Sequence, residues 1–143
     1  MEFGHATGKD EQMNLIQLKT DTTTFFNDFT AVFAIFDGAR IAQRYAAPYL
    51  AIHADGSSEL FPTAESIAAY FQRIVDGYRS SGCHSCRYGH LEIVPMGSTA
   101  VLGTVTWELL RADGSVLTAW RESYNLAYQH GRLKAFVSVD HSE

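Results

Sequence analysis

Positive charge is scarce in this sequence, which carries 11 lysine and arginine residues against 16 aspartate and glutamate residues, for a formal net charge of −5. This balance argues against binding of nucleic acid or of an anionic membrane surface through electrostatic attraction. The sequence also lacks an apolar run of the roughly 20 residues that a membrane-spanning helix requires. Its polar N-terminus contains no signal-peptide core, so a cytoplasmic location is expected.

Sequence motifs for several kinds of chemistry are missing as well. The sequence has no glycine-rich phosphate loop, no nucleophile elbow and no metal-ligand spacing, so no cofactor and no metal are expected. Cysteine is limited to Cys83 and Cys86, in a Cys-His-Ser-Cys segment that follows a predicted helix. A redox-active pair is favoured at a helix N-terminus, and a zinc site needs about four ligands. Structural thiols are therefore expected, with a thiol-based sensor as the alternative.

The composition is typical of one globular domain: of the 143 residues, 46% are hydrophobic and 19% are charged. A chain of this length buries about two-thirds of the surface that it exposes when unfolded. Residues 1–20 are predicted to form an N-terminal arm or to be a remnant of an expression tag. Residues 21–143 are predicted to form a single domain.

Apolar residues recur at helical spacing from Asp21 onward and predict a first helix. Its predicted buried stripe consists of Phe25, Phe29, Val32, Phe33 and Phe36. A shorter second helix is predicted over residues 41–45, and it ends before Pro48 because the residue ahead of a proline disfavours helical geometry.

The second half of the chain has the period of a β-sheet. Residues 49–53 predict a short strand, residues 59–61 a stub, and residues 63–82 a third helix, after which the period changes from 3.6 to 2. The long strands expected are 87–94, 99–111, 116–128 and 133–140. The predicted fold class is therefore α+β, with a strongly curved antiparallel sheet of four long strands plus a short N-terminal strand. This sheet wraps around two to three N-terminal helices and forms a cone with an internal cavity.

The register of the central hairpin follows from its turn. Asp113-Gly114 is a strong signal for a type I′ turn, which requires positive φ at both central residues. This turn places Trp107 opposite Trp120 and Val105 opposite Glu122. Glu122 is thereby predicted to be a lone carboxylate in the middle of an apolar, aromatic sheet face.

A second tight turn is predicted at His130-Gly131. It sets three pairs, which are Glu122 opposite Val139, Tyr124 opposite Val137 and Leu126 opposite Ala135. On the other face it places Arg121 opposite Asp140, which predicts a cross-strand ion pair. That outer face is half apolar, and such a face favours use as an association surface.

The element order resembles that of the nuclear-transport-factor-2-like superfamily, including its SnoaL-like and ketosteroid-isomerase-like members. Three segments carry the resemblance: Tyr45-x-x-Pro48-Tyr49, the run Arg121-Glu122-Ser123-Tyr124, and residues 135–141. The resemblance implies a cone-shaped fold and a homodimer that forms through the outer sheet face. It leaves the function open, because the superfamily contains isomerases, cyclases, dehydratases, epoxide hydrolases and non-enzymatic binding modules.

Two residues are predicted to be catalytic. Burial of Glu122 among Trp107, Trp120 and Tyr124 disfavours its charged form and raises its pKa, so that it can donate a proton or a hydrogen bond. His53 lies at the end of the first predicted strand, where the resemblance implies a catalytic polar group, and histidine is a suitable general base. The isomerases have acidic residues at this place, so the chain departs from their pattern.

The predicted ligand-binding residues come from three strands and from the segment after the second helix. Tyr45 and Tyr49 flank the start of the first strand, and Trp107, Trp120 and Tyr124 line the aromatic sheet face. These five side chains are expected to contact the ligand.

The direction of His90 and Glu92 depends on the next loop along the chain. A two-residue turn at Met96-Gly97 sends both side chains into the cavity as further ligand-binding residues, together with Tyr88. A slip of one residue instead sends them outward and buries Leu91 and Ile93. The sequence leaves both registers open.

The leading hypothesis is a protein that binds a small apolar, cyclic or aromatic ligand in this cavity. The expected chemistry is proton transfer of the isomerase, cyclase or dehydratase type without a cofactor, with Glu122 as the acid and His53 as the base. The alternative is a non-catalytic module of the same fold that dimerises or sequesters a ligand.

Overall fold

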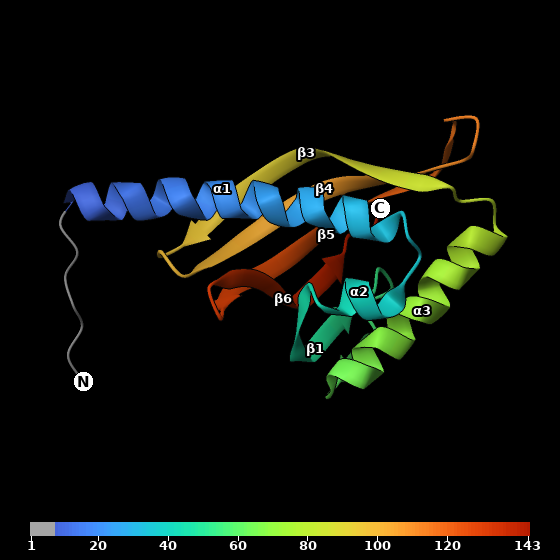
Figure 1. Cartoon of the computed structure of the whole chain (residues 1–143), viewed down its shortest axis with the longest axis horizontal. Helices are drawn as coiled ribbons and strands as arrows, with labels where there is room; N and C mark the ends of the chain where they lie inside the picture. The colour runs from blue at the N-terminus through green and yellow to red at the C-terminus, as the bar shows by residue number, and fades with distance from the viewer. Residues whose placement is uncertain (1–7) are drawn as a thin grey trace.

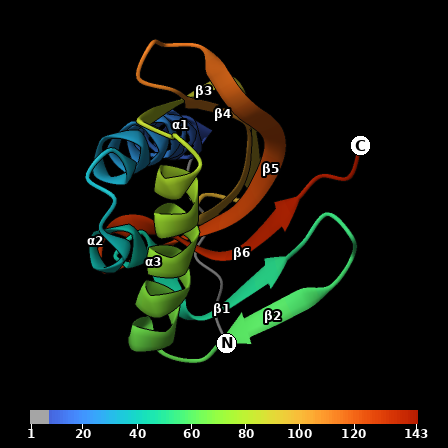
Figure 2. The same ribbon diagram turned by 90° about the vertical axis from the view of Figure 1, so that its right-hand side faces the viewer.

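Three helices lie on one side of a six-stranded sheet that curves around them (Figures 1 and 2). The structure is a computed structural model that describes residues 8–143. The helices are α1 (Gly8–Phe33), α2 (Gly38–Ala42) and α3 (Ala64–Ser80). The strands are β1 (Tyr45–Ile52), β2 (Ser58–Phe61), β3 (Ser85–Met96), β4 (Ala100–Leu110), β5 (Val116–Gln129) and β6 (Arg132–Asp140). This arrangement confirms the predicted α+β class and its curved sheet.

The strand order is β2-β1-β6-β5-β4-β3, and all neighbouring strands are antiparallel except β1 and β6. The parallel pair brings the first strand of the chain against the last one. As a result, residues from the beginning and the end of the domain meet at one end of the sheet. None of the helices in residues 8–143 has the length and apolar character that crossing a bilayer requires.

Helix α1 begins well before Asp21, where the sequence pattern placed its start. The buried stripe extends backward through Thr22 and Leu18, which are both fully buried. The Thr22 hydroxyl donates a hydrogen bond to the Leu18 carbonyl at 2.7 Å, so this polar residue is tolerated inside the stripe. A threonine at that position hid the continuation of the apolar pattern. Residues 1–7 of the predicted N-terminal arm lie outside the described residues.

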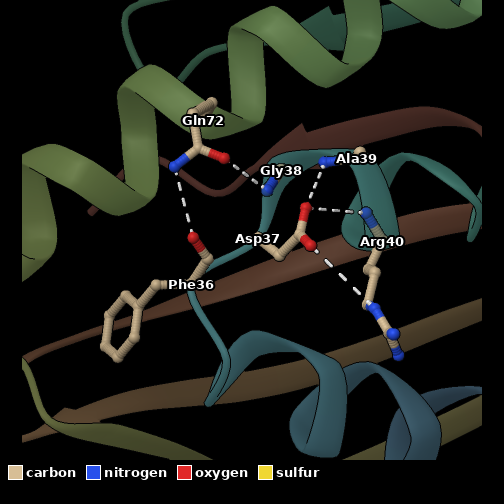
Figure 3. A network of polar contacts seen from close by, with 6 residues as sticks. All are labelled: Phe36, Asp37, Gly38, Ala39, Arg40 and Gln72. Atoms are coloured by element: carbon tan, nitrogen blue, oxygen red, sulfur yellow. Dashed lines mark hydrogen bonds and ion pairs between the residues drawn. The ribbon is translucent and has the colours of Figure 1, made fainter.

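The second helix lies three residues earlier than predicted, and strand β1 begins at Tyr45. Asp37 caps α2, because its Oδ1 accepts hydrogen bonds from the amides of Ala39 and Arg40 at 3.0 and 3.3 Å (Figure 3). Two hydrogen bonds from Gln72 of α3 connect the start of α2 to the longer helix. The Gln72 Oε1 accepts from the Gly38 amide at 2.7 Å, and the Gln72 Nε2 donates to the Phe36 carbonyl at 3.2 Å (Figure 3).

The β4–β5 hairpin has the predicted register but not the predicted turn. Trp107 pairs with Trp120 and Val105 with Glu122, as expected. Gly114 has positive φ whereas Asp113 does not, and the hairpin closes on a three-residue loop. The extra loop residue is offset by a bulge at Leu117, so the pairs beyond it return to the register of a two-residue turn.

The β5–β6 hairpin begins as predicted and then departs from the prediction. His130 and Gly131 both have positive φ, and Leu126 pairs with Ala135. A bulge at Phe136 then shifts every later pair by one residue. The predicted partners Val139 and Val137 are therefore wrong, as is the predicted opposition of Arg121 and Asp140.

The same bulge decides which side chains of β6 face the helices. Tyr124 pairs with Ser138, and Glu122 pairs with Asp140. Because residues directly opposite each other project from the same face of a sheet, Ser138 and Asp140 face inward. The two valines that were expected there lie on the outer face.

Strand β3 has the facing of the outward alternative after a bulge, because Ile93 lies opposite the inward Gly103. A bulge of two residues, His90 and Leu91, lies between the pairs formed by Gly89 and by Glu92. Before this bulge Tyr88 faces inward, and its ring packs on Phe26 with centroids 5.7 Å apart. After it, Glu92 lies on the outer face. The inward register is therefore wrong, and His90 and Glu92 do not line the cavity.

Gly38 is the point at which α2 and α3 approach most closely, and a side chain there should be costly. A Cβ atom would lie 2.6 Å from the Ala68 carbonyl oxygen and 2.6 Å from the Gln72 amide nitrogen, both of which belong to the backbone. Gly38→Ala should lower the free energy of unfolding by about 1–3 kcal/mol, as measured by urea denaturation.

The matched control is Gly77→Ala in α3, where a Cβ atom meets nothing within 4 Å. That substitution should raise the free energy of unfolding by about 0.5–1 kcal/mol, because alanine favours a helix interior over glycine. Equal effects of the two substitutions would contradict the close approach of α2 to α3.

Candidate functional site

A cavity lies between α3, the inner face of β1 and the inner faces of β4 to β6. It holds about 90 Å³ of space for the centres of water molecules, and ten of its lining residues are aromatic. A single water needs roughly 10–15 Å³ by this measure, so the space has room for several waters or for one small organic molecule. Seven predicted site residues line it, namely His53, Glu122, Tyr45, Tyr49, Trp107, Trp120 and Tyr124.

Glu122 lies at the centre of the inner face of β5. Its side chain is buried, with 9% of the residue exposed, and its Oε1 accepts a hydrogen bond from the Trp120 indole nitrogen at 2.8 Å. Burial is the main cause that raises the pKa of Glu122, to about 8, and the charge of Asp140 adds to the shift. Hydrogen bonds from Trp120 and Tyr124 oppose this shift without cancelling it. At neutral pH Glu122 therefore holds a proton.

Asp140 is the site residue that the sequence pattern did not reveal. The predicted register placed it on the outer face beside Arg121, whereas the bulge at Phe136 turns it inward to face Glu122. Asp140 lines the cavity and lies directly opposite Glu122 in the β5–β6 pairing. No glycine or proline marks the bulge, so the sequence carried no local signal for it.

Tyrosine hydroxyl groups provide further polar atoms around the two acids. The Trp107 indole donates a hydrogen bond to the Tyr124 hydroxyl at 2.7 Å, and the hydroxyls of Tyr49 and Ser138 lie 2.5 Å apart. Burial raises the pKa of Tyr49 and Tyr124 far above the ordinary value, so both hydroxyls stay neutral. Indole and phenol groups thus form short polar links through a wall that is otherwise apolar.

Tyr45 is a further tyrosine of the cavity wall. Only 4% of Tyr45 is exposed, and its ring packs against those of Tyr49 and Phe71 with centroids 4.6 Å away in each case. Burial also raises the pKa of Tyr45 well above the ordinary value. Within residues 8–143 no group hydrogen-bonds its hydroxyl, although the residue lines the cavity. The cavity therefore contains a hydrogen-bonding group that is available to a ligand.

His53 lies at the rim of the cavity, where β1 ends. Its Nε2 is 3.0 Å from Oε1 of Glu59 on β2, and its side chain is 27% exposed. In the described part of the chain, no hydrogen bond joins it to Glu122. Both residues nevertheless line the same cavity, and Asp140 is the residue that lies opposite Glu122 on the neighbouring strand. The catalytic pairing of Glu122 with His53 stays a prediction.

The two cysteines are buried free thiols. Burial raises the pKa of Cys83, and it raises the pKa of Cys86 to about 12. Because the reactive species is the thiolate, this environment does not favour the thiol-based sensor. Within residues 8–143, no three His, Cys, Asp or Glu side chains are grouped closely enough to hold a metal ion.

The outer sheet face carries a polar network of its own. Arg121 pairs with Glu92 of β3 at 3.1 Å, and this contact replaces the predicted pair with Asp140. Next to it, the Ser123 hydroxyl lies 2.7 Å from both the Thr104 hydroxyl and Nε2 of His141. The homodimer through this face stays a prediction.

Comparison with known proteins identifies relatives of the fold. A model of the family described as NTF2-like protein (DUF6841) matches residues 20–143. No curated protein matches the chain. An NTF2-like protein with a cystatin-like fold from Novosphingobium aromaticivorans is 9% identical with a TM-score of 0.76, and the match covers 99% of this chain and 92% of that one.

Two further solved structures have the same architecture. Aln2 from a Streptomyces species is 19% identical with a TM-score of 0.71, over 88% of this chain and 91% of that one. An NTF2-like protein from Shewanella oneidensis is 12% identical with a TM-score of 0.70, over 87% and 98% of the two chains. At these identities the likeness shows the fold alone.

The raised pKa of Glu122 has a consequence for stability. Between the ordinary value of 4.5 and about 8, the folded state holds a proton that the unfolded state has lost. The contribution of Glu122 to stability is thus fully present below pH 4.5 and is lost as the pH rises to 8, at about 1.4 kcal/mol per pH unit. Glu122→Gln removes this titration, so its free energy of unfolding should rise relative to wild type across that range.

Urea denaturation at pH 5, 6, 7 and 8 measures this difference. The matched control is Glu143→Gln, which neutralises an exposed acid beyond the end of β6 and should follow the wild-type curve. A Glu122→Gln curve parallel to that of wild type would show that Glu122 is ionised in the folded protein.

Proposed function

Because the chain belongs to the NTF2-like family DUF6841, as its element order predicted, we propose that it binds a small, largely apolar molecule in the cavity beneath its helices. The proposed chemistry is acid–base proton transfer without a cofactor, of the isomerase, cyclase or dehydratase type. The observation that carries this proposal is the pair of carboxyl groups, Glu122 and Asp140, on neighbouring strands inside an aromatic cavity.

The two carboxyl groups differ in a way that suits acid–base work. Glu122 is buried and holds a proton at neutral pH, whereas Asp140 is only half-buried and lies nearer to solvent. Two carboxyl groups in unlike surroundings can provide an acid and a base within one site. In this assignment Glu122 is the general acid, and Asp140 is the base next to it.

The step conserves atoms and charge. Asp140 removes a proton from a carbon of the substrate, and the electron pair left behind moves toward a substrate oxygen or nitrogen. Glu122 donates its proton to that atom, or holds it by a hydrogen bond while charge develops. In an isomerisation, the proton on Asp140 then passes to another carbon of the substrate while Glu122 takes its own proton back from the substrate oxygen or nitrogen. Both carboxyl groups thereby return to their starting protonation states. Tyr45 is available to hydrogen-bond the same substrate atom.

His53 retains a proposed role at the rim. Its imidazole is held by Glu59, and it lies at the edge of the space that Glu122 lines. A substrate longer than the cavity would place its outer end against this ring. His53 is therefore proposed to act on the outer end of such a substrate, either as a base or by holding that end in position.

Hydrogen–deuterium exchange tests proton transfer without knowledge of the full reaction. Small cyclic ketones and lactones are incubated with the protein in D₂O, and loss of the proton next to the carbonyl is followed by NMR. Wild type should accelerate exchange for at least one compound. Glu122→Gln and Asp140→Asn should each reduce that rate by about 10²-fold or more, which is the usual contribution of a general acid or base.

Glu143→Gln is the matched control and should exchange at the wild-type rate. Exchange by Glu122→Gln at the wild-type rate would remove Glu122 from the chemistry. Binding without exchange, seen as a change in tryptophan fluorescence across the same compounds, would instead identify the non-catalytic, ligand-sequestering module.

A further inference from the structure

The cavity wall contains acidic side chains without lysine or arginine among its described residues. Its lining includes two carboxyl groups, Glu122 and Asp140, and no lysine or arginine of residues 8–143. The one basic side chain of this lining is His53 at the rim, which is held by Glu59. An anionic ligand would therefore have no cation to pair with and would lie against a negative charge. A ligand that carries positive charge would meet Asp140 as its counter-ion.

The aromatic rings favour the same sign of charge. Aromatic rings from α1, α3, β1, β4 and β5 line the cavity. The ring centroids of Tyr45 and Tyr49 on β1 lie 4.6 Å apart, and those of Tyr78 on α3 and Trp120 on β5 lie 6.1 Å apart. The face of an aromatic ring carries partial negative charge and attracts an ammonium group. In the described part of the chain, no cation lies over any of these four rings.

The Tyr45 hydroxyl supports the binding of a polar ligand atom here. The residue is 4% exposed and lines the cavity, and its hydroxyl hydrogen-bonds no other group in residues 8–143, but the oxygen itself is not enclosed by protein atoms. A hydroxyl that opens into a largely apolar cavity is a place where water or a ligand can form a hydrogen bond. The carbon atoms of an alkylammonium ion can contact the rings while its positive charge is attracted by the dipole of this hydroxyl.

We propose that the ligand of this cavity is a small organic cation of the alkylammonium class, held by Asp140 as counter-ion, by the aromatic faces around Tyr45 and Trp120, and by the Tyr45 hydroxyl. This inference rests on the proposed function, because it requires that the cavity binds a ligand. Its new element is that this ligand carries a positive charge. It also implies that a substrate in this site reacts at or beside a positively charged centre.

Binding of such a cation is coupled to the proton on Glu122. The titratable groups that line the cavity with Glu122 come from every element around it. They are Tyr45 and Tyr49 from β1, His53 after the end of β1, Tyr70 and Tyr78 from α3, Cys86 from β3, Tyr124 from β5, and Asp140 from β6. The tyrosines and the cysteine remain neutral, because burial raises the pKa of each. As the pH rises toward 8, loss of the Glu122 proton adds a second negative charge. The affinity for a permanent cation should therefore increase with pH.

Tryptophan fluorescence provides a direct measurement, because both tryptophans of the chain line the cavity. The probes are tetramethylammonium, neutral tert-butanol and anionic pivalate, which share a compact branched shape and differ in charge. Tetramethylammonium should bind at least about tenfold more tightly than tert-butanol, because a desolvated cation is attracted by the ring faces as well as by Asp140. Pivalate should bind most weakly of the three.

Two variants test the assigned roles. Asp140→Asn should remove the preference for tetramethylammonium over tert-butanol, and its circular dichroism spectrum, matching that of wild type, checks that the variant is folded. Glu122→Gln should keep that preference at pH 6 and lose the increase in tetramethylammonium affinity between pH 6 and 9. Glu143→Gln should behave as wild type in both measurements.

The outcomes separate this inference from the proposed function. Binding of tert-butanol or pivalate as tight as that of tetramethylammonium would overturn the cation proposal and leave the ligand-binding cavity intact. No fluorescence change with any of the three probes, up to molar concentrations, would overturn both. A pH-independent affinity of wild type for tetramethylammonium would overturn the coupling to Glu122.

Discussion

The contact between Glu122 and Asp140 is the constraint on which the rest of the site depends. Two carboxyl groups on neighbouring strands cannot both be ionised in an apolar cavity at low cost, so one of them keeps its proton. Burial selects Glu122, because Asp140 is the more exposed of the two and Glu122 lies deeper among the rings. Glu122 thus keeps a proton that can be transferred, which the proposed acid–base chemistry requires.

Three bulges decide which side chains surround that pair. The bulge at Phe136 brings Ser138 and Asp140 inward, the bulge at Leu117 restores the register that sets Trp120 beside Glu122, and the bulge at His90 moves Glu92 to the outer face. Each bulge adds one residue to one strand and reverses the facing of the residues beyond it. The bulges also increase local twist, which is consistent with the strong curvature of the sheet (Figure 2).

The sequence predicts the fold well because its signals there are repeated over many residues. Inward and outward residues alternate over most of β4 to β6, and the phenylalanine stripe of α1 spans several helical turns. A single exception such as Thr22 therefore changes the predicted start of an element and not its type. Glu122 and the aromatic side chains around it were also predictable, since the register of β4 and β5 survives an incorrect turn type. Asp140 was not predictable, because the facing of β6 depends on one inserted residue. Valines and polar residues alternate along that strand, and its apolar pattern favoured the wrong face.

That apolar pattern has a physical explanation in the site itself. In an ordinary half-buried strand, Val137 and Val139 would face the core, while Ser138 and Asp140 would face solvent. Here the inward serine accepts or donates the hydrogen bond of the Tyr49 hydroxyl, and the inward aspartate faces Glu122. Turning polar groups inward and valines outward lowers stability relative to the reverse arrangement, since each buried valine is worth about 1.5 kcal/mol or more. This facing of the strand agrees with the proposed chemistry, which needs a second carboxyl group beside Glu122.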